Sequence, residues 1–327
     1  MKTIAFNIAK FIVSIALAAW VLSMVGFSSV YQHITGIGWV AFTSATLILV
    51  LHVVVVAPRW AEILRSYSVE VFAHRLVPVV LFTHFLNQSL PFGIAGEVAR
   101  SWQLLQAGVA KSAAIRSVIL DRLFGLVALV VPLVIGLPFF ALQTNNAAIS
   151  AGLAALLVAS GLAFVVIGLF CPVRSPSTLK AILWSVLLYN EMGALLRTSR
   201  TAFHIVALSV LGQLLPILAC VMFSLSIAPS VPWIALLVVV PVSLLASLLP
   251  VSWAGWGIRE LTFVELLSSL GCDSGEAFAI SVLLGLALTV SGLLAGALYF
   301  TIPARLRAIS LIKSGPAAGS PASIGTI

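Results

Sequence analysis

The sequence predicts an all-α polytopic membrane protein, in which two inverted repeats each contribute three membrane spans and one re-entrant helical hairpin. Three observations support this fold class. Hydrophobic residues make up 61% of the 327 residues and charged residues 8%, with a mean hydropathy of +1.20. One motif with proline, glycine and arginine at fixed spacing occurs twice. Basic residues gather in short stretches between apolar runs.

The composition argues against a soluble enzyme, because no soluble fold of this length needs so much apolar surface. The net charge of +8 fits the positive-inside rule for cytoplasmic loops better than nucleic-acid binding. The three cysteines have no CxxC spacing and the five histidines form no ligand pattern. We therefore expect no disulfide framework, metal or cofactor, and a packing or interfacial role for each histidine. The lack of a P-loop argues against direct use of ATP.

The repeated motif lies inside apolar sequence, once near residue 95 and once near residue 255. In both copies glycine follows a Leu-Pro proline by five residues and arginine follows it by nine. These residues are Pro91, Gly96 and Arg100 in the first copy and Pro250, Gly255 and Arg259 in the second. A carboxylate accompanies each arginine: Glu97 one helical turn before it and Glu260 directly after it. Broken helices at membrane depth occur only where they are buried or line a cavity, so we expect the motifs to form the functional centre.

Six apolar runs are expected to cross the membrane, which takes about 20 helical residues. The first follows Lys2 and Lys10 and is interpreted as an uncleaved helix that leaves the N-terminus in the cytoplasm. The second is expected to end at Pro58, with Trp60 and Tyr67 at headgroup level in the basic loop that follows. The runs cover about residues 11–27, 37–57, 117–140, 148–170, 201–227 and 277–302.

Two shorter stretches carry the motifs and are predicted to turn back within the membrane. If residues 76–90 crossed fully, Lys111 and Arg116 would lie outside. A hairpin that turns back at Pro91 keeps them in the cytoplasm with the other basic loops. By the same reasoning, residues 233–275 enter and leave from the outside.

The two halves are predicted to lie in opposite orientations, because each contains an odd number of spans. This is the plan of many transporters, in which broken helices bind substrate near the membrane midplane. The repeats cover about residues 1–142 and 147–302 of a single transmembrane domain that spans 1–313. The small polar residues from 314 to 327 are expected to form a disordered tail.

Arg100 and Arg259 are the candidate phosphate ligands, since a guanidinium group donates two parallel hydrogen bonds and stays charged. Glu97 and Glu260 would hold these arginines in place or contact an amine in the substrate. The alternative is structural, with each Arg-Glu pair tying a hairpin tip to its neighbours.

Two more groups of candidate residues lie beside the first motif. Asp121 and Arg122, near the start of the third predicted span, would pair with the first hairpin or anchor that span at the interface. Asn87 and Gln88 would coordinate a headgroup or cap backbone groups that the helix break leaves free.

In the second half, Trp253 and Trp256 would anchor the chain at the interface or stack on a sugar or sterol-like ring. Glu265, on the returning limb of the second hairpin, would be a proton carrier if transport is coupled to protons.

These motifs resemble the membrane domain of lysylphosphatidylglycerol synthases and its stand-alone, flippase-like relatives, over about residues 1–302. The resemblance is carried by the two motifs and by residues 117–122, Ser-Val-Ile-Leu-Asp-Arg. The family usually has Glu where this chain has Asp121, which keeps the charge. It also has a richer glycine run where this chain has Phe92-Gly93-Ile94-Ala95, which is expected to alter the hairpin tip.

The resemblance implies a lipid translocator that moves a polar or anionic lipid between leaflets, such as a phospholipid, a hopanoid-type lipid or a polyprenyl-linked lipid. Full-length members add a soluble domain that transfers an aminoacyl group from tRNA to lipid, and nothing in this sequence matches it. We therefore expect no enzymatic activity. The expected partners are membrane lipids, without nucleic acid, in a bacterial cytoplasmic membrane with both termini inside. The alternatives are an ion-coupled transporter of a small soluble substrate, or a non-catalytic accessory to lipid or glycan synthesis.

Overall fold

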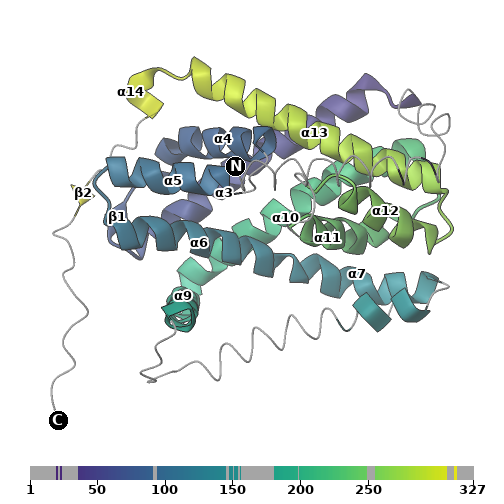
Figure 1. The fold of residues 1–327 in the computed structure, drawn as a ribbon, viewed down its shortest axis with the longest axis horizontal. Coiled ribbons are helices and arrows are strands. Elements are labelled where there is room, and N and C mark those ends of the chain that lie inside the picture. The colour runs from purple at the N-terminus through teal and green to yellow at the C-terminus, as the bar shows by residue number, and fades with distance from the viewer. Residues whose placement is uncertain are drawn as a thin grey trace, which may run out of the picture.

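Figure 1 shows the computed structural model, in which most of the described residues are helical. It describes residues 20, 23, 36–90, 94–144, 147–149, 151–153, 155, 180–197, 199–248, 255–307 and 313–314. Within these residues, four helices are long and apolar enough to cross a membrane: Trp39–Arg65, Lys111–Gln143, Arg200–Ile227 and Ser274–Thr301. The all-α polytopic membrane fold is therefore confirmed.

The described elements follow one another in two comparable series. The first is α3 (Trp39–Arg65), β1 (Val69–Glu70), α4 (Ala73–Ser89), α5 (Ala95–Gln106), α6 (Lys111–Ala128) and α7 (Val130–Gln143). The second is α9 (Lys180–Arg197), α10 (Ser199–Ile227), η1 (Trp233–Ala235), α11 (Leu236–Ser247), α12 (Ile258–Ser268), α13 (Ser274–Thr301), α14 (Ala304–Arg307) and β2 (Lys313–Ser314). The two-residue strands pair antiparallel and bring the chain after α14 back to the end of α3.

The four long helices match the second, third, fifth and sixth predicted spans. The third begins at Lys111, earlier than expected, and consists of α6 and α7 joined at Leu129. Nearly all of the first predicted span, most of the fourth and the tail from residue 315 lie outside the described residues.

The expectation that the second span ends at Pro58 is wrong. α3 continues through this proline to Arg65, because packing against neighbouring helices can compensate for the missing backbone donor in a membrane helix. Trp60, expected at headgroup level, is fully buried, and Arg59 is only 5% exposed. The longer helix thus carries a charged side chain into the interior.

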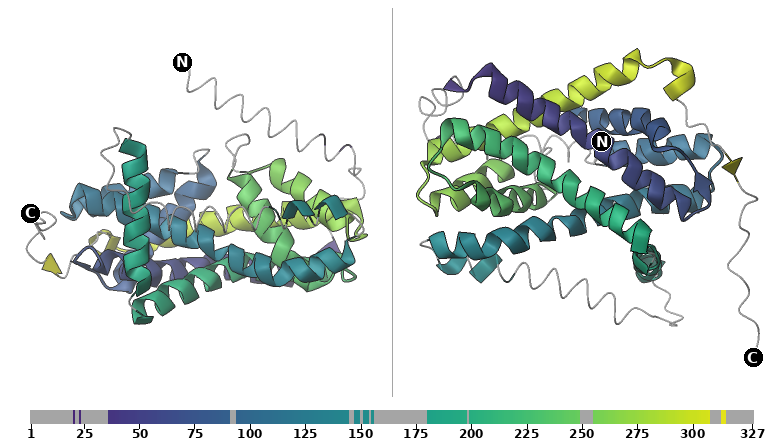
Figure 2. Two further views of the ribbon diagram at one scale, coloured as in Figure 1. Left: turned by 90° about the horizontal axis from the view of Figure 1, so that it is seen from below. Right: turned by 180° about the vertical axis from the view of Figure 1, so that it is seen from behind.

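Both motif regions form pairs of short helices, α4 with α5 and α11 with α12. The returning helices contain 12 and 11 residues, or roughly 18 and 16 Å, well short of the ~30 Å hydrocarbon core. The two pairs lie toward opposite ends of the molecule (Figures 1 and 2). Residues 91–93 and 249–254, which hold the motif prolines, lie outside the described residues.

Each helix pair packs against spans of both halves. α4 packs along α13, α11 packs along α7, and α3 packs along α10. One apolar core surrounds α11 and α12 and includes Phe223 and Phe263, while another surrounds α4 and includes Trp60 and Leu104. The contacts are therefore reciprocal between the halves, although their opposite orientation in a membrane stays a prediction.

The motif glycines lie where the two arms of each pair are in close contact. A Cβ atom at Gly96 would lie 2.5 Å from Cγ2 and 2.7 Å from the backbone oxygen of Thr83 in α4. Gly255 has a φ of +82°, and a Cβ there would collide with Ser247 in α11. The two motif glycines therefore have the same packing function in both copies.

Basic residues concentrate at one end of the molecule. α3 ends at Arg65, α6 begins at Lys111, and α14 contains Arg305 and Arg307. These element ends lie together at the left of Figure 1, whereas α13 begins at the right. Asp273 caps that start of α13, so the two ends of the fold differ in charge.

Candidate functional site

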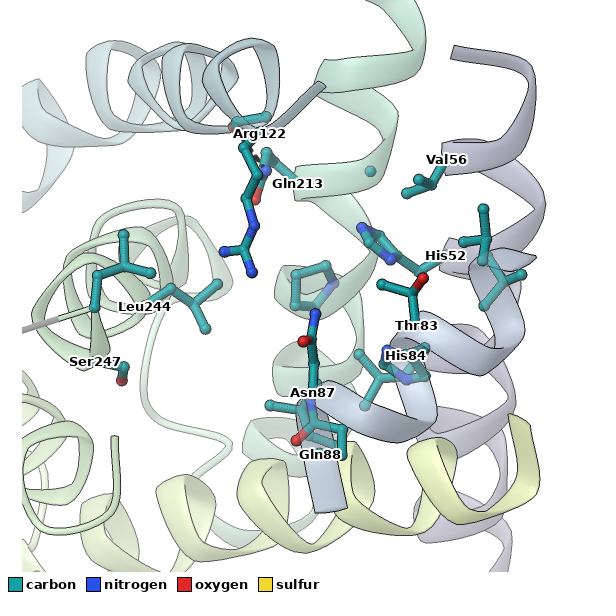
Figure 3. Close-up of a pocket in the computed structure, with 18 of the residues that line it drawn as sticks. His52, Val56, Thr83, His84, Asn87, Gln88, Arg122, Gln213, Leu244 and Ser247 are labelled. Carbon is teal, nitrogen blue, oxygen red and sulfur yellow. Dashed lines mark hydrogen bonds between the residues drawn. The ribbon is translucent and has the colours of Figure 1, made fainter. Parts of the chain in front are cut away.

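A cavity of about 370 Å³ lies between the two helix pairs and is also bordered by α3, α6, α10 and α13. His52, Thr83 and Arg122 approach this space from three different helices (Figure 3). Among the described residues, the charged side chains that line it are Arg59, Glu97, Arg100, Asp121, Arg122 and Arg259. Arginines outnumber carboxylates, so the described lining is cationic.

Asp121 on α6 joins two arginines from different helices. Its Oδ1 accepts a hydrogen bond from Arg59 Nε at 2.7 Å, and its Oδ2 accepts one from Arg100 Nη1 at 2.8 Å. All three residues are at most 5% exposed. Thr83 Oγ1 accepts a further bond from Arg100 Nε at 3.2 Å, and the Trp60 ring lies 4.8 Å from the same guanidinium. Two buried cations thus share one carboxylate.

A second ion pair joins the first hairpin to α6. Arg122 donates to Glu97 Oε1 through Nε at 2.8 Å and through Nη2 at 2.6 Å. Asn87 Oδ1 accepts the Gly96 N–H at 2.9 Å, which caps the start of α5, and Asn87 Nδ2 donates to Glu97 Oε1 at 3.2 Å. Asp121 and Arg122 therefore both bind the hairpin, the first of the two alternatives considered above.

The expectation that Glu97 accompanies Arg100 is wrong. The two side chains lie one turn apart, but Arg100 binds Asp121 and Glu97 binds Arg122. The partners come from α6 because α5 and α6 pack side by side. In the first half, sequence proximity therefore predicted the wrong partner for Arg100.

In the second half, Arg259 and Glu260 pair with each other. Arg259 Nη2 lies 2.6 Å from Glu260 Oε1, and Glu260 Oε2 accepts the Gly257 N–H. The arginine packs against Trp256, with 4.7 Å between the guanidinium and the ring. A Cβ at Gly285 of α13 would collide with the guanidinium, so this glycine provides the space that Arg259 occupies.

The remaining sequence candidates have different locations. Gln88 lines the cavity and packs on Gly292 of α13. Glu265 is exposed and lines a separate cavity with residues at the end of α12. Trp253 lies outside the described residues. Among the described residues, the cavity lining therefore includes most of the predicted site residues but neither Glu260 nor Glu265.

Comparison with protein families indicates what kind of protein contains this site. The family described as the lysylphosphatidylglycerol synthase TM region matches residues 7–296. The chain belongs to this family. The lysylphosphatidylglycerol synthase TM family consists of membrane proteins linked to lipid handling, and the resemblance inferred from the two motifs is confirmed. No curated protein matches the chain.

Four cavity residues were not identified as candidates from the sequence of this family member. Arg59 was assigned to a loop because Pro58 was interpreted as a helix end. His52 and His84 are isolated histidines in apolar runs, and Gln213 is an isolated amide on α10 that donates to the Gly125 carbonyl at 2.8 Å. A useful signal was available, since polar side chains inside predicted membrane spans default to functional candidates.

Proposed function

We propose that this protein is a lipid translocator that moves anionic lipids between leaflets, with the headgroup bound in the cavity between the helix pairs. The observation that carries the proposal is the cationic cavity, in which Arg59 and Arg100 share Asp121 and are joined by Arg122 and Arg259. Membership of a lipid-handling membrane family supports a lipid as the substrate.

The chemistry of the cavity suits a phosphate group. Guanidinium groups donate paired hydrogen bonds to phosphate oxygens and keep their charge when buried. Charged groups inside a membrane are costly and are usually retained for function. Asp121 balances only one of its two arginines, which favours the entry of a further negative charge.

The placement of the cavity suits a path for a headgroup. Helices interrupted near the middle of a membrane form the substrate sites of many inverted-repeat transporters. Here the cavity lies between two interrupted helices, and spans from both halves border it. The acyl chains would stay in the hydrocarbon while the headgroup moves through this polar space.

We further propose that the basic end of the molecule faces the cytoplasm of a bacterial cell, with both termini inside, because basic segments stay on the cytoplasmic side. The first helix pair would then enter from the cytoplasm and the second from the outside.

The arginines also support binding rather than catalysis. Both carboxylates that line the cavity, Glu97 and Asp121, are held by arginines. A general acid or base must be able to gain and lose a proton, whereas a carboxylate bound to arginine stays ionised. We therefore propose membrane lipids as the partners and assign no enzymatic step or nucleic-acid binding.

The test is leaflet-to-leaflet movement of labelled lipids in liposomes that contain the purified full chain. The lipid panel includes phosphatidylglycerol, phosphatidylethanolamine and a polyprenyl phosphate. The Arg100→Ala/Arg259→Ala variant should lose movement, whereas the control Arg65→Ala, on an exposed arginine at the basic end, should behave like the wild type.

The outcomes separate the candidate functions. Movement of anionic lipids that the double variant loses supports the proposal and names the headgroup class. If the folded wild-type protein moves none of these lipids, the proposal fails, and a transporter of a small soluble anion becomes the better explanation of the cavity.

A further inference from the structure

Two histidines from different helices meet at the cavity. His52 comes from α3 and His84 from α4, and both line the space (Figure 3). Their ring centroids are 6.5 Å apart. His84 Nε2 lies 2.9 Å from Ser291 Oγ on α13, which fixes the position of that ring. The pair is therefore held between three helices.

The histidines differ from the other ionisable groups that line the cavity. Arginine keeps its proton at all physiological pH values, and Glu97 and Asp121 are both bound to arginines. Histidine is the side chain whose unperturbed pKa, about 6.5, lies in the physiological range. Among the described lining residues, the two imidazoles are thus the groups that can gain a proton when a negative charge enters the cavity.

The surroundings of the pair make its protonation sensitive to an anion. The charged groups that face it are Arg59 from α3, Arg100 from α5 and Asp121 from α6. α10 presents the uncharged Gly212 and Gln213, and α13 presents the uncharged Ser291. No carboxylate beyond the arginine-bound ones is available to the rings among these neighbours.

We propose that His52 and His84 form a proton-binding site, and that the cavity takes up one proton with each anionic headgroup that it binds. A negative charge in the cavity favours the protonated form of a nearby imidazole. Protonation of one ring disfavours protonation of the other, because like charges at this distance repel. The pair therefore takes up one proton and not two.

This proposal rests on the proposed function and adds coupling to it. A headgroup with one negative charge and one accompanying proton crosses the membrane without net charge. The membrane potential then exerts no force on the loaded state, whereas a pH difference drives it. The protein would behave as a cotransporter of a proton and an anionic lipid.

The first test is calorimetric binding of dihexanoyl phosphatidylglycerol to the purified full chain in detergent. This phosphodiester keeps one charge between about pH 5.5 and pH 8, so any pH dependence comes from the protein. We expect the affinity to rise by up to about tenfold per pH unit as the pH falls, the limit for one linked proton. Titrations in buffers with different ionisation enthalpies should show uptake of one proton.

The variants assign the effect to the pair. His52→Gln/His84→Gln should bind the lipid with an affinity that does not change with pH. The matched control is His74→Gln, since His74 is exposed and stacks on Phe72 away from the cavity, and it should keep the wild-type pH dependence. Retention of that dependence in the double variant would overturn the proposal.

A second measurement separates this proposal from the proposed function. In vesicles with the potential clamped at zero, a pH difference should drive net movement of phosphatidylglycerol by the wild-type protein. Movement or binding that ignores pH refutes the proton site and leaves the translocator in place. If the folded wild-type protein neither binds nor moves phosphatidylglycerol, both proposals fail together.

Discussion

The two halves of the molecule use the same motif but neutralise its arginine differently. In the first half, the partner of Arg100 is Asp121 on α6, which also binds Arg59 from α3. In the second half, the partner of Arg259 is its neighbour Glu260 on the same helix. On α13 the residues that face Arg259 are uncharged: Ser281 accepts a hydrogen bond from Nε at 3.4 Å, and Gly285 leaves space for the guanidinium.

This difference determines how each arginine is neutralised and which half gives the cavity its excess positive charge. The second hairpin carries its own counter-charge and can neutralise its arginine without help from another span. The first hairpin depends on α6 and α3 for its charge balance, and these helices add an uncompensated cation to the cavity. The net positive charge of the site therefore comes from the first half.

Cysteine labelling tests whether the two halves lie in opposite orientations in the membrane. This experiment has the largest expected effect. Single cysteines at Ser112 and Ser274, in a chain whose native cysteines are replaced, should react with membrane-impermeant probes from opposite sides. Ser112 should label from the cytoplasm and Ser274 from outside. Labelling of both positions from the same side would exclude inverted halves.

Two variants that replace a carboxylate by an uncharged amide test the difference in charge balance through their unfolding free energies. Asp121→Asn leaves two buried arginines without a counter-charge and should cost about 3–5 kcal/mol. Glu260→Gln leaves one arginine and should cost less. Unfolding of both variants in detergent gives the order, and an equal or larger loss for Glu260→Gln would contradict the comparison.

Replacement of each motif arginine by lysine keeps the charge but removes the paired donors. Arg259→Lys should lower the transport rate about tenfold, which corresponds to ~1.4 kcal/mol. The same variant should lose less than this amount of unfolding free energy. Arg100→Lys should lose more stability, because Arg100 binds Asp121 and Thr83 through different nitrogens. Unimpaired transport by Arg259→Lys would show that Arg259 does not clamp phosphate.

Glu265→Gln should have the smallest effect. Glu265 is exposed and lies outside the central cavity, so transport and its pH dependence should stay within about twofold of the wild type, as expected for surface changes. Loss of the pH dependence in this variant would restore Glu265 as the proton carrier and count against the histidine pair.

The sequence predicted the elements well because their signals are local. Long apolar runs determine α10 and α13, and the motif glycines Gly96 and Gly255 lie at the close contacts within both helix pairs. The error in helix length at Pro58 arose because a proline that ends an isolated helix is tolerated where neighbouring helices support the backbone.

Most of the candidate residues line one cavity, but the ion pairs of the first half were not predicted. Glu97 and Arg100 are neighbours on a helix, yet the approach of α6 gives each a different partner. His52 and His84 carry no spacing signal, since they lie in separate helices and meet only after folding. Such pairings depend on tertiary contacts that a single sequence does not contain.

Under the proposed function, the shared Asp121 would also limit how tightly a headgroup is held. A phosphate that binds Arg59 and Arg100 competes with a carboxylate that is permanently attached at hydrogen-bonding distance from both. Asp121 would re-form its hydrogen bonds to both arginines as the phosphate group dissociates. Under the proposed function, a carrier must let its cargo leave as readily as it enters, and Asp121 would supply the exchange partner that speeds release.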